Sequence, residues 1–252
     1  FAKGAIGRGA NREEDPMISQ ASKSILTAEE EKLLSFVSEH TTMLRAQVWL
    51  RNIVDNEKRY GFKQPLKTAD APGGKVVVLG AGPGFKRFGT EDLQKILKHR
   101  KDITIVACDG ALATLSALGH KADYVTSVDG HPVVANFYRR ALRKPYALPA
   151  QPVTAVLSTT VHPDTVEWAK AYSNENVKWI QPFFREGAYT TNKELDYSKF
   201  YRNGVLSINP GGNVGTTCYI IASLILKSAP IGLMGLEFAW SDETPLSDTQ
   251  YF

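Results

Sequence analysis

The sequence has little of what marks several classes of protein. Its two cysteines, Cys108 and Cys218, form no C-x-x-C pair and no metal-ligand spacing, so each is interpreted as a buried core thiol rather than a redox or zinc residue. No apolar run reaches the roughly 18 residues of a membrane span, and the first residues are polar, unlike a signal peptide. Lysine and arginine form no concentrated stripe, although the net charge is +4. We therefore expect a cytoplasmic protein with no membrane or nucleic-acid partner.

What the sequence does contain is a valine-rich strand that runs into a glycine-rich turn. Four apolar residues at 76–79 are followed by glycines at alternate positions, Gly80, Gly82 and Gly84. This pattern is typical of a buried parallel strand that ends in a tight turn. A helix is predicted from Thr90, and the N–H groups of a turn before a helix form an anion site. The turn therefore predicts a phosphate ligand.

Two well-known glycine motifs do not fit this turn. The dinucleotide fingerprint needs its third glycine at Phe85, whereas this chain has it at Gly84, and Pro83 removes one backbone donor. A Walker loop is excluded because no Gly-Lys-Ser/Thr follows. A nicotinamide dehydrogenase is thus disfavoured, and an ordinary strand-to-helix turn stays open as an alternative.

Strands alternate with helices along the rest of the chain. Further strands are predicted at 103–108, 123–129, 153–157, 177–180, 205–208 and 231–236. Alternation at this spacing implies βαβ crossovers. The expected fold class is α/β, a Rossmann-like open, mostly parallel sheet with helices on both faces.

The segment before the first strand has a different character. Residues 1–24 are a polar arm, a capping box at Thr27 starts one helical stretch, a second runs over 42–58, and 60–74 is interpreted as a linker. We expect residues 1–74 to form this arm and a small helical unit, a cap or homo-oligomerisation surface without chemistry. Residues 75–252 are expected to form the nucleotide-binding domain, as part of a longer protein.

The candidate site follows from one rule, that ligands bind outside the carboxyl ends of parallel strands. Asp109 and Asp129 each follow a strand, and two carboxylates on neighbouring strand ends could hold a divalent ion that bridges phosphates. Accepting a ribose hydroxyl and capping the next helix remain alternatives for Asp109. His131 is a candidate phosphate or base contact, with a structural hydrogen bond as the alternative. The remaining candidate binding residues at strand ends are Gly80, Gly82, Pro83, Gly84, Gly110, Gly211, Gly212, Asn213 and Glu237.

With these motifs in this order over about residues 75–240, the sequence resembles the archaeal MptE-like family, which is related to the central domain of motility-associated (Maf) glycosyltransferases. The motifs that carry the resemblance are Gly80-Ala81-Gly82-Pro83-Gly84, residues 107–111 with 122–129, residues 211–214, and residues 234–237. The resemblance implies a 6-hydroxymethyl-7,8-dihydropterin diphosphokinase, in which Mg-ATP donates diphosphate to the pterin and AMP leaves. It implies a pterin-like substrate, ATP as co-substrate and Mg²⁺ held by Asp109 and Asp129, both taken as catalytic.

The middle of the chain is also similar to thiamine pyrophosphokinases. Asp109-Gly110-Ala111 matches their Asp-Gly turn and Asp129 matches one acid of their next strand end, but Ser127 stands where the partner acid belongs. Phe183, Phe184 and Asn213 are candidates for contacts to a pterin ring. Two other functions stay open, a nucleotide-sugar-dependent glycosyltransferase of Maf type and a non-catalytic nucleotide-binding module.

Overall fold

The structure is a computed structural model that describes residues 27–71, 73–82, 89–143, 150–183 and 197–237. Its centre is a seven-stranded sheet in the order β6-β5-β4-β3-β2-β1-β7, in which every neighbouring pair is parallel. The strands are β1 (Val76–Leu79), β2 (Thr104–Cys108), β3 (Tyr124–Ser127), β4 (Thr154–Ser158), β5 (Val177–Pro182), β6 (Leu206–Ile208) and β7 (Ile231–Met234). The predicted α/β class with an open parallel sheet is confirmed.

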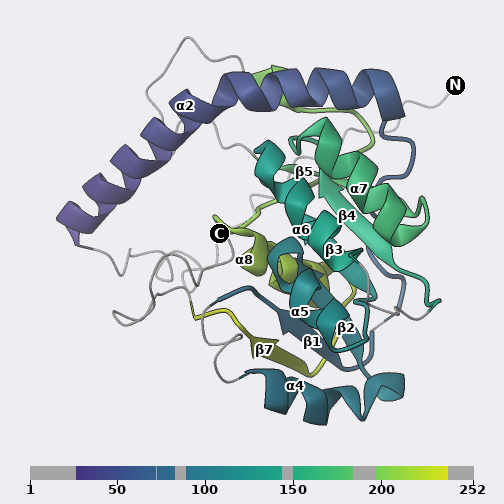
Figure 1. The fold of residues 1–252 in the computed structure, drawn as a ribbon. Coiled ribbons are helices and arrows are strands. Elements are labelled where there is room, and N and C mark those ends of the chain that lie inside the picture. The colour runs from purple at the N-terminus through teal and green to yellow at the C-terminus, as the bar shows by residue number, and fades with distance from the viewer. Residues whose placement is uncertain (1–26, 72, 83–88, 144–149, 184–196, 238–252) are drawn as a thin grey trace, which may run out of the picture.

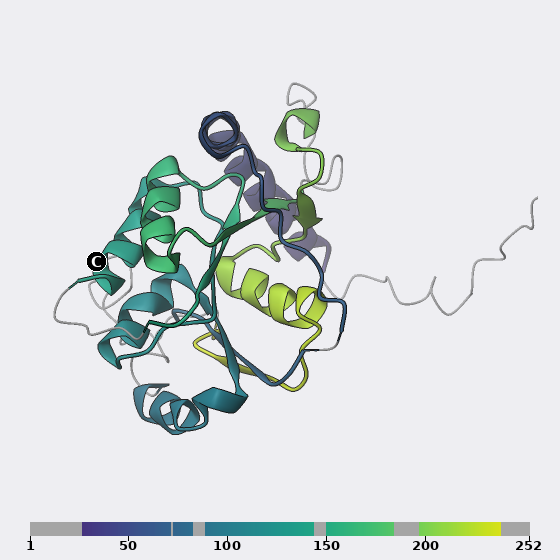
Figure 2. The same ribbon diagram turned by 90° about the vertical axis from the view of Figure 1, so that its right-hand side faces the viewer.

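Helices cover both faces of this sheet. From β1 to β5 the chain steps in one direction, and right-handed crossovers then place every connecting helix on the same face. These helices are α4 (Gly89–Leu97), α5 (Leu112–Ala117), α6 (Ala135–Ala141) and α7 (Pro163–Ser173). The return from β6 to β7 reverses the direction, so α8 (Val214–Ile220) and its π-helical continuation η5 (Ile221–Ile225) lie on the opposite face (Figure 2).

Four short 3₁₀ helices complete the regular structure of the described residues. They are η1 (Arg100–Asp102), η2 (Asp109–Ala111), η3 (Pro132–Val134) and η4 (Tyr197–Phe200). Of these, η2 directly follows β2, whereas η3 follows β3 after the turn of residues 128–131. Within the part of the chain that the structure describes, no helix is long and apolar enough to cross a membrane.

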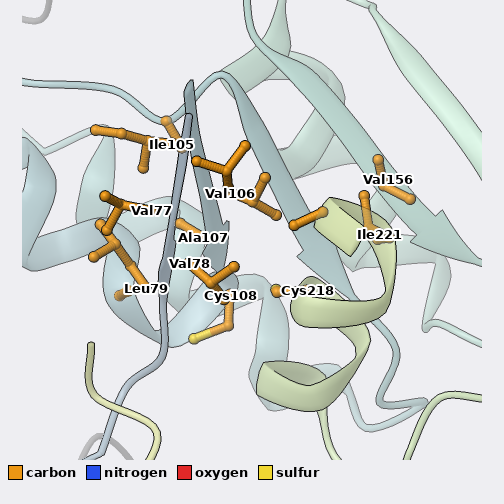
Figure 3. Close-up of a cluster of buried hydrophobic side chains, with 14 of the residues drawn as sticks. Val77, Val78, Leu79, Ile105, Val106, Ala107, Cys108, Val156, Cys218 and Ile221 are labelled. Atoms are coloured by element: carbon orange, nitrogen blue, oxygen red, sulfur yellow. The ribbon is translucent and has the colours of Figure 1, made fainter. Parts of the chain in front are cut away.

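The core lies where the inner strands meet the helices. Residues of β1 and β2 such as Val78 and Val106 are fully buried and pack with Ile221 of the helix behind them (Figure 3). Cys108 and Cys218 belong to the same cluster and are free thiols, as predicted. Burial raises the pKa of the Cys108 thiol well above its ordinary value and that of Cys218 to about 12, so neither is a reactive thiolate at neutral pH.

The two helical stretches predicted before residue 60 are one helix, α2 (Ala28–Tyr60). The helix continues between the two predicted stretches because no glycine or proline interrupts this range. One end of α2 lies over α7, and the other extends away from the helices around the sheet (Figure 1). Near Tyr60 the helix is part of the fold, since Ile53 is fully buried among residues of α7 and β4. The predicted polar arm lies outside the described residues.

The predicted linker at 60–74 pairs with the sheet domain along much of its length. The Leu66 N–H donates to the Trp179 carbonyl at 2.8 Å, and the Ala69 N–H donates to the Ile225 carbonyl at 2.7 Å. Phe62 packs edge-on against the Trp179 ring at 4.8 Å between centroids. Described residues of this segment therefore connect α2 to the domain through hydrogen bonds and aromatic packing.

A very close backbone approach joins β1 to β7. Beyond the last strand pair, the Gly80 N–H donates to the Met234 carbonyl at 2.8 Å and the Gly82 N–H to the Gly235 carbonyl at 2.9 Å. A Cβ atom on Gly80 would lie 2.0 Å from the Gly235 carbonyl oxygen, a distance that no side chain tolerates. Gly80 is therefore required because two backbones touch at its position.

We predict that Gly80→Ala lowers the free energy of unfolding by about 1–3 kcal/mol, the usual cost of an overpacked buried site. Gly74→Ala is the control, because a Cβ at Gly74 meets no atom of the described residues within 4 Å, and its effect should stay within about 0.5 kcal/mol. Urea denaturation of the two variants measures both values. Equal unfolding midpoints for the two would contradict this account of Gly80.

Candidate functional site

The candidate residues after β1, β2, β3 and β7 lie on one edge of the sheet. These four strands are adjacent and parallel, so their carboxyl ends open on the same side. Gly80 follows β1, Asp109 follows β2, Asp129 lies just beyond β3 and Glu237 lies just beyond β7. We call the edge formed by these strand ends the rim.

Asp109 is the buried carboxyl of the rim. It is only 5% exposed, and its Oδ1 accepts the Gly110 N–H at 2.7 Å. Burial raises the pKa of Asp109 to about 7; hydrogen bonds from Ser127 and from the Gly110 N–H oppose this rise, and the charge of Asp129 adds to it. A buried carboxyl that titrates near neutrality, beside a second carboxylate, is a common feature of functional sites.

Two buried hydroxyl groups, those of Ser127 and Tyr138, lie near Asp109. The Ser127 Oγ lies 2.9 Å from the Tyr138 hydroxyl, and both side chains are fully buried. Either hydroxyl of this pair could be the donor, and the Ser127 hydroxyl also lowers the pKa of Asp109. Ser127, the residue that stands where a partner acid was expected, thus acts as a hydrogen-bond donor. No sequence pattern singles out Tyr138, which reaches this position from α6.

Asp129 and His131 lie in the exposed turn that follows β3. The Asp129 Oδ1 accepts the His131 N–H at 2.9 Å. The His131 Nδ1 accepts the Val133 N–H at 3.1 Å, so the imidazole caps η3. With Nδ1 acting as an acceptor, the neutral ring carries its proton on Nε2. His131 therefore has the structural hydrogen bond, while Nε2–H remains the group that could donate to an anion.

The first glycine turn uses two of its donors inside the protein. The N–H groups of Gly80 and Gly82, which were predicted to bind phosphate, bond instead to the carbonyls of Met234, the last residue of β7, and Gly235. A Cβ on Gly82 would lie 1.9 Å from the Glu237 Oε2, so the Glu237 carboxylate lies directly against this glycine. Pro83 and Gly84 lie outside the described residues. In the described part of the turn, the glycines serve close approach to Gly235 and Glu237.

The second glycine loop, residues 211–215, contacts the same residues after β7 as the first glycine turn. Gly211 and Gly212 have positive φ angles of 65° and 86°, which only glycine adopts freely. Asn213 caps α8, with its Oδ1 accepting the Thr216 N–H at 2.9 Å. A Cβ on Gly215 would lie 2.2 Å from a methyl carbon of Leu236, the residue between Gly235 and Glu237. The structure therefore brings both glycine loops together at residues 235–237, although β6 itself lies at the far edge of the sheet.

The carboxylates of the rim suit Mg²⁺ that is bound together with phosphate. Among the described residues, no group of three or more His, Cys, Asp and Glu side chains could hold a metal. Mg²⁺ usually takes one or two carboxylates, several waters and substrate phosphates, which is the set that Asp109 and Asp129 could complete. A cation would also favour the ionised form of Asp109, whose burial otherwise favours the proton. The donor set fits a phosphate-bound Mg²⁺ and does not fit a metal held by protein ligands alone.

The fold is that of a Rossmann-like α/β protein, with the candidate residues gathered at the carboxyl ends of its strands. The chain belongs to the MptE-like family, because the sequence model of "6-hydroxymethylpterin diphosphokinase MptE-like" matches residues 47–243. This confirms the resemblance seen in the sequence. The match begins within α2, so the family region includes the end of this helix that packs on the domain.

The chain is also similar to a curated protein and to a solved structure. An uncharacterized protein of Treponema pallidum (strain Nichols) is 26% identical over 116 residues, which covers 42% of this chain and 53% of that protein. The chain thus spans about half the length of this curated relative. The solved structure of the MAf glycosyltransferase from Magnetospirillum magneticum AMB-1 matches with a TM-score of 0.49 and 18% identity, covering 73% of this chain and 26% of that one.

The raised pKa of Asp109 predicts a pH dependence of stability. The folded protein keeps the Asp109 proton up to about pH 7, whereas the unfolded chain releases it near pH 4. Raising the pH through this window therefore costs the folded state stability, by a few kcal/mol in total. Asp109→Asn removes the titrating group and should not lose stability in this way. The free energy of unfolding of the variant, relative to that of the unchanged protein, should therefore be higher at pH 8 than at pH 5.

Urea denaturation at both pH values measures this difference. The control is Asp70→Asn, which neutralises an exposed carboxylate and should show no such trend. If the difference between Asp109→Asn and the unchanged protein is the same at pH 5 and pH 8, then Asp109 is not protonated in the folded state.

Proposed function

We propose that this protein is a Mg²⁺-dependent diphosphotransferase that moves diphosphate from ATP to the hydroxymethyl group of a pterin. Membership of the MptE-like family supports the reaction class. The observation that carries the proposal is the pair of carboxyls on neighbouring strand ends, buried Asp109 and exposed Asp129, close enough that the charge of one raises the pKa of the other.

In this reaction the pterin hydroxymethyl oxygen attacks the β-phosphorus of ATP. The bond from the β-phosphorus to the oxygen that bridges it to the α-phosphorus breaks, AMP leaves, and the hydroxyl proton passes to solvent. Bound Mg²⁺ would offset the negative charge of the phosphates. Asp109 and Asp129 would hold it, since two like-charged carboxyls beside each other are stabilised by a cation between them.

The remaining rim residues have roles that their contacts allow. His131 would offer its Nε2–H to a phosphate oxygen, because its Nδ1 is already bonded to the Val133 N–H. Gly212 would let a phosphate approach the loop closely, since a Cβ there meets no described atom within 4 Å, whereas Gly211 makes room for the Thr216 side chain. Ser127 and Tyr138 would hold the Asp109 carboxylate toward the rim rather than touch the substrates.

The test is formation of AMP from ATP in the presence of Mg²⁺ and 6-hydroxymethyl-7,8-dihydropterin. We expect Asp129→Asn to lower kcat by about 100-fold or more, the effect of removing one group that stabilises developing charge. The exposed position of Asp129 predicts little change in the urea midpoint of this variant. Asp70→Asn, with an exposed carboxylate outside the rim, should keep full activity.

Two results would contradict the proposal. One is the absence of AMP formation by the unchanged protein at any Mg²⁺ concentration. The other is an Asp129→Asn variant that turns over at the normal rate, which would make Asp129 a structural residue.

A further inference from the structure

The turn that carries Asp129 is held from outside the sheet by helix α2. Asn52 of α2 is 2% exposed, and its side-chain Nδ2 donates to the Gly130 carbonyl at 3.0 Å and to the Thr160 carbonyl at 2.9 Å. Gly130 lies between Asp129 and His131 in the chain. One amide group therefore joins the turns that follow β3 and β4.

Gly130 is packed against the same helix. A Cβ at this position would lie 2.8 Å from the Trp49 Cδ1, 2.9 Å from the Thr160 carbonyl oxygen and 3.1 Å from the Asn52 Nδ2. Only glycine allows the turn to come this close to α2. The close approach and the hydrogen bond are independent observations that place the same turn against the same helix face.

The turn is also held on the other side of Asp129. The Thr160 Oγ1 donates to the Val128 carbonyl at 3.2 Å. The residues on either side of Asp129 are thus both bonded to groups outside their own turn, Val128 to Thr160 and Gly130 to Asn52. The exposed carboxylate projects from a backbone that is fixed at both neighbours.

We propose that Asn52 is a positioning residue, whose amide fixes the turn of residues 128–131 so that Asp129 lies beside Asp109 at the rim. This inference rests on the proposed diphosphotransferase function and extends its site to a helix that the sequence analysis assigned no chemistry. Asn52 does not touch the substrates; it acts through the Gly130 carbonyl.

Asn56 provides a matched control on the same helix. It is fully buried, and its Nδ2 also donates to two carbonyls, those of Thr159 at 3.2 Å and Val161 at 2.8 Å. Replacing either asparagine by alanine removes one buried amide and two hydrogen bonds to carbonyls. Only Asn52 bonds to the turn that carries Asp129.

The experiment compares Asn52→Ala with Asn56→Ala in two measurements. The first is hydrogen–deuterium exchange of the amides at 129–134 in the protein without ligands, which includes the His131 N–H bonded to Asp129. We expect Asn52→Ala to speed this exchange at least tenfold and Asn56→Ala to leave it within twofold. The second is the kinetics of AMP formation, where Asn52→Ala should lower kcat at least tenfold with a smaller change in the KM for ATP, and Asn56→Ala should lower it less than twofold.

The proposal is overturned if the two variants change exchange at 129–134 equally, or if kcat falls equally in both. If the unchanged protein forms no AMP, the diphosphotransferase proposal fails by itself, and the exchange result alone decides whether Asn52 fixes the turn. If Asn52→Ala does not fold, Gly130→Ala replaces it, because its new methyl group pushes the turn away from Trp49 and Asn52. It should show the same faster exchange and lower kcat, and normal values for both would overturn the proposal.

Discussion

The close approach of β7 to the end of β1 is the constraint on which the rim depends. The chain reaches β7 by crossing behind the sheet through α8, so the order of strands reverses at β1. Such a reversal in an open parallel sheet is where ligands characteristically bind. In this protein the ends of β1 and β7 can approach each other because Gly80 and Gly82 lack side chains where the Gly235 carbonyl and the Glu237 carboxylate lie. This contact brings the second glycine loop, through Leu236, to the same edge as Asp109.

The second constraint is the burial of Asp109, which is costly in a protein without a compensating charge. Burial disfavours the carboxylate, and the nearby Asp129 disfavours it further. The protein offsets part of this cost with Ser127 and the Gly110 N–H, while Tyr138 continues the network into the core. Below about pH 7 the proton that Asp109 keeps removes the rest of this cost, and above it the buried carboxylate is left without a compensating charge. In the function proposed above, Mg²⁺ bound with the phosphates of a nucleotide would supply that charge.

Residues next to one another in the sequence were predictable, and contacts between distant residues were not. Short strands of apolar and β-branched residues followed by aspartate identify Asp109 and Asp129, because parallel strands all present the same end. The same pattern could not show that β7 takes up the amides of Gly80 and Gly82, since that pairing joins segments far apart in the chain. Nor could it show Asn52 bonded to Gly130, 78 residues away. The capping box and apolar spacing predicted helix before residue 60, but not its continuity.

In the proposed function, the ends of β1, β2, β3 and β7 form a site for a nucleoside triphosphate with Mg²⁺. Thermal denaturation with ATP, AMP and CMP, each with Mg²⁺ and with EDTA, tests it most directly. A ligand at about 100 times its dissociation constant adds roughly 2.7 kcal/mol to stability. The account predicts a rise in Tm with Mg²⁺ and ATP that EDTA removes and that Asp129→Asn strongly reduces. No rise with ATP, or an equal rise in EDTA, would contradict it.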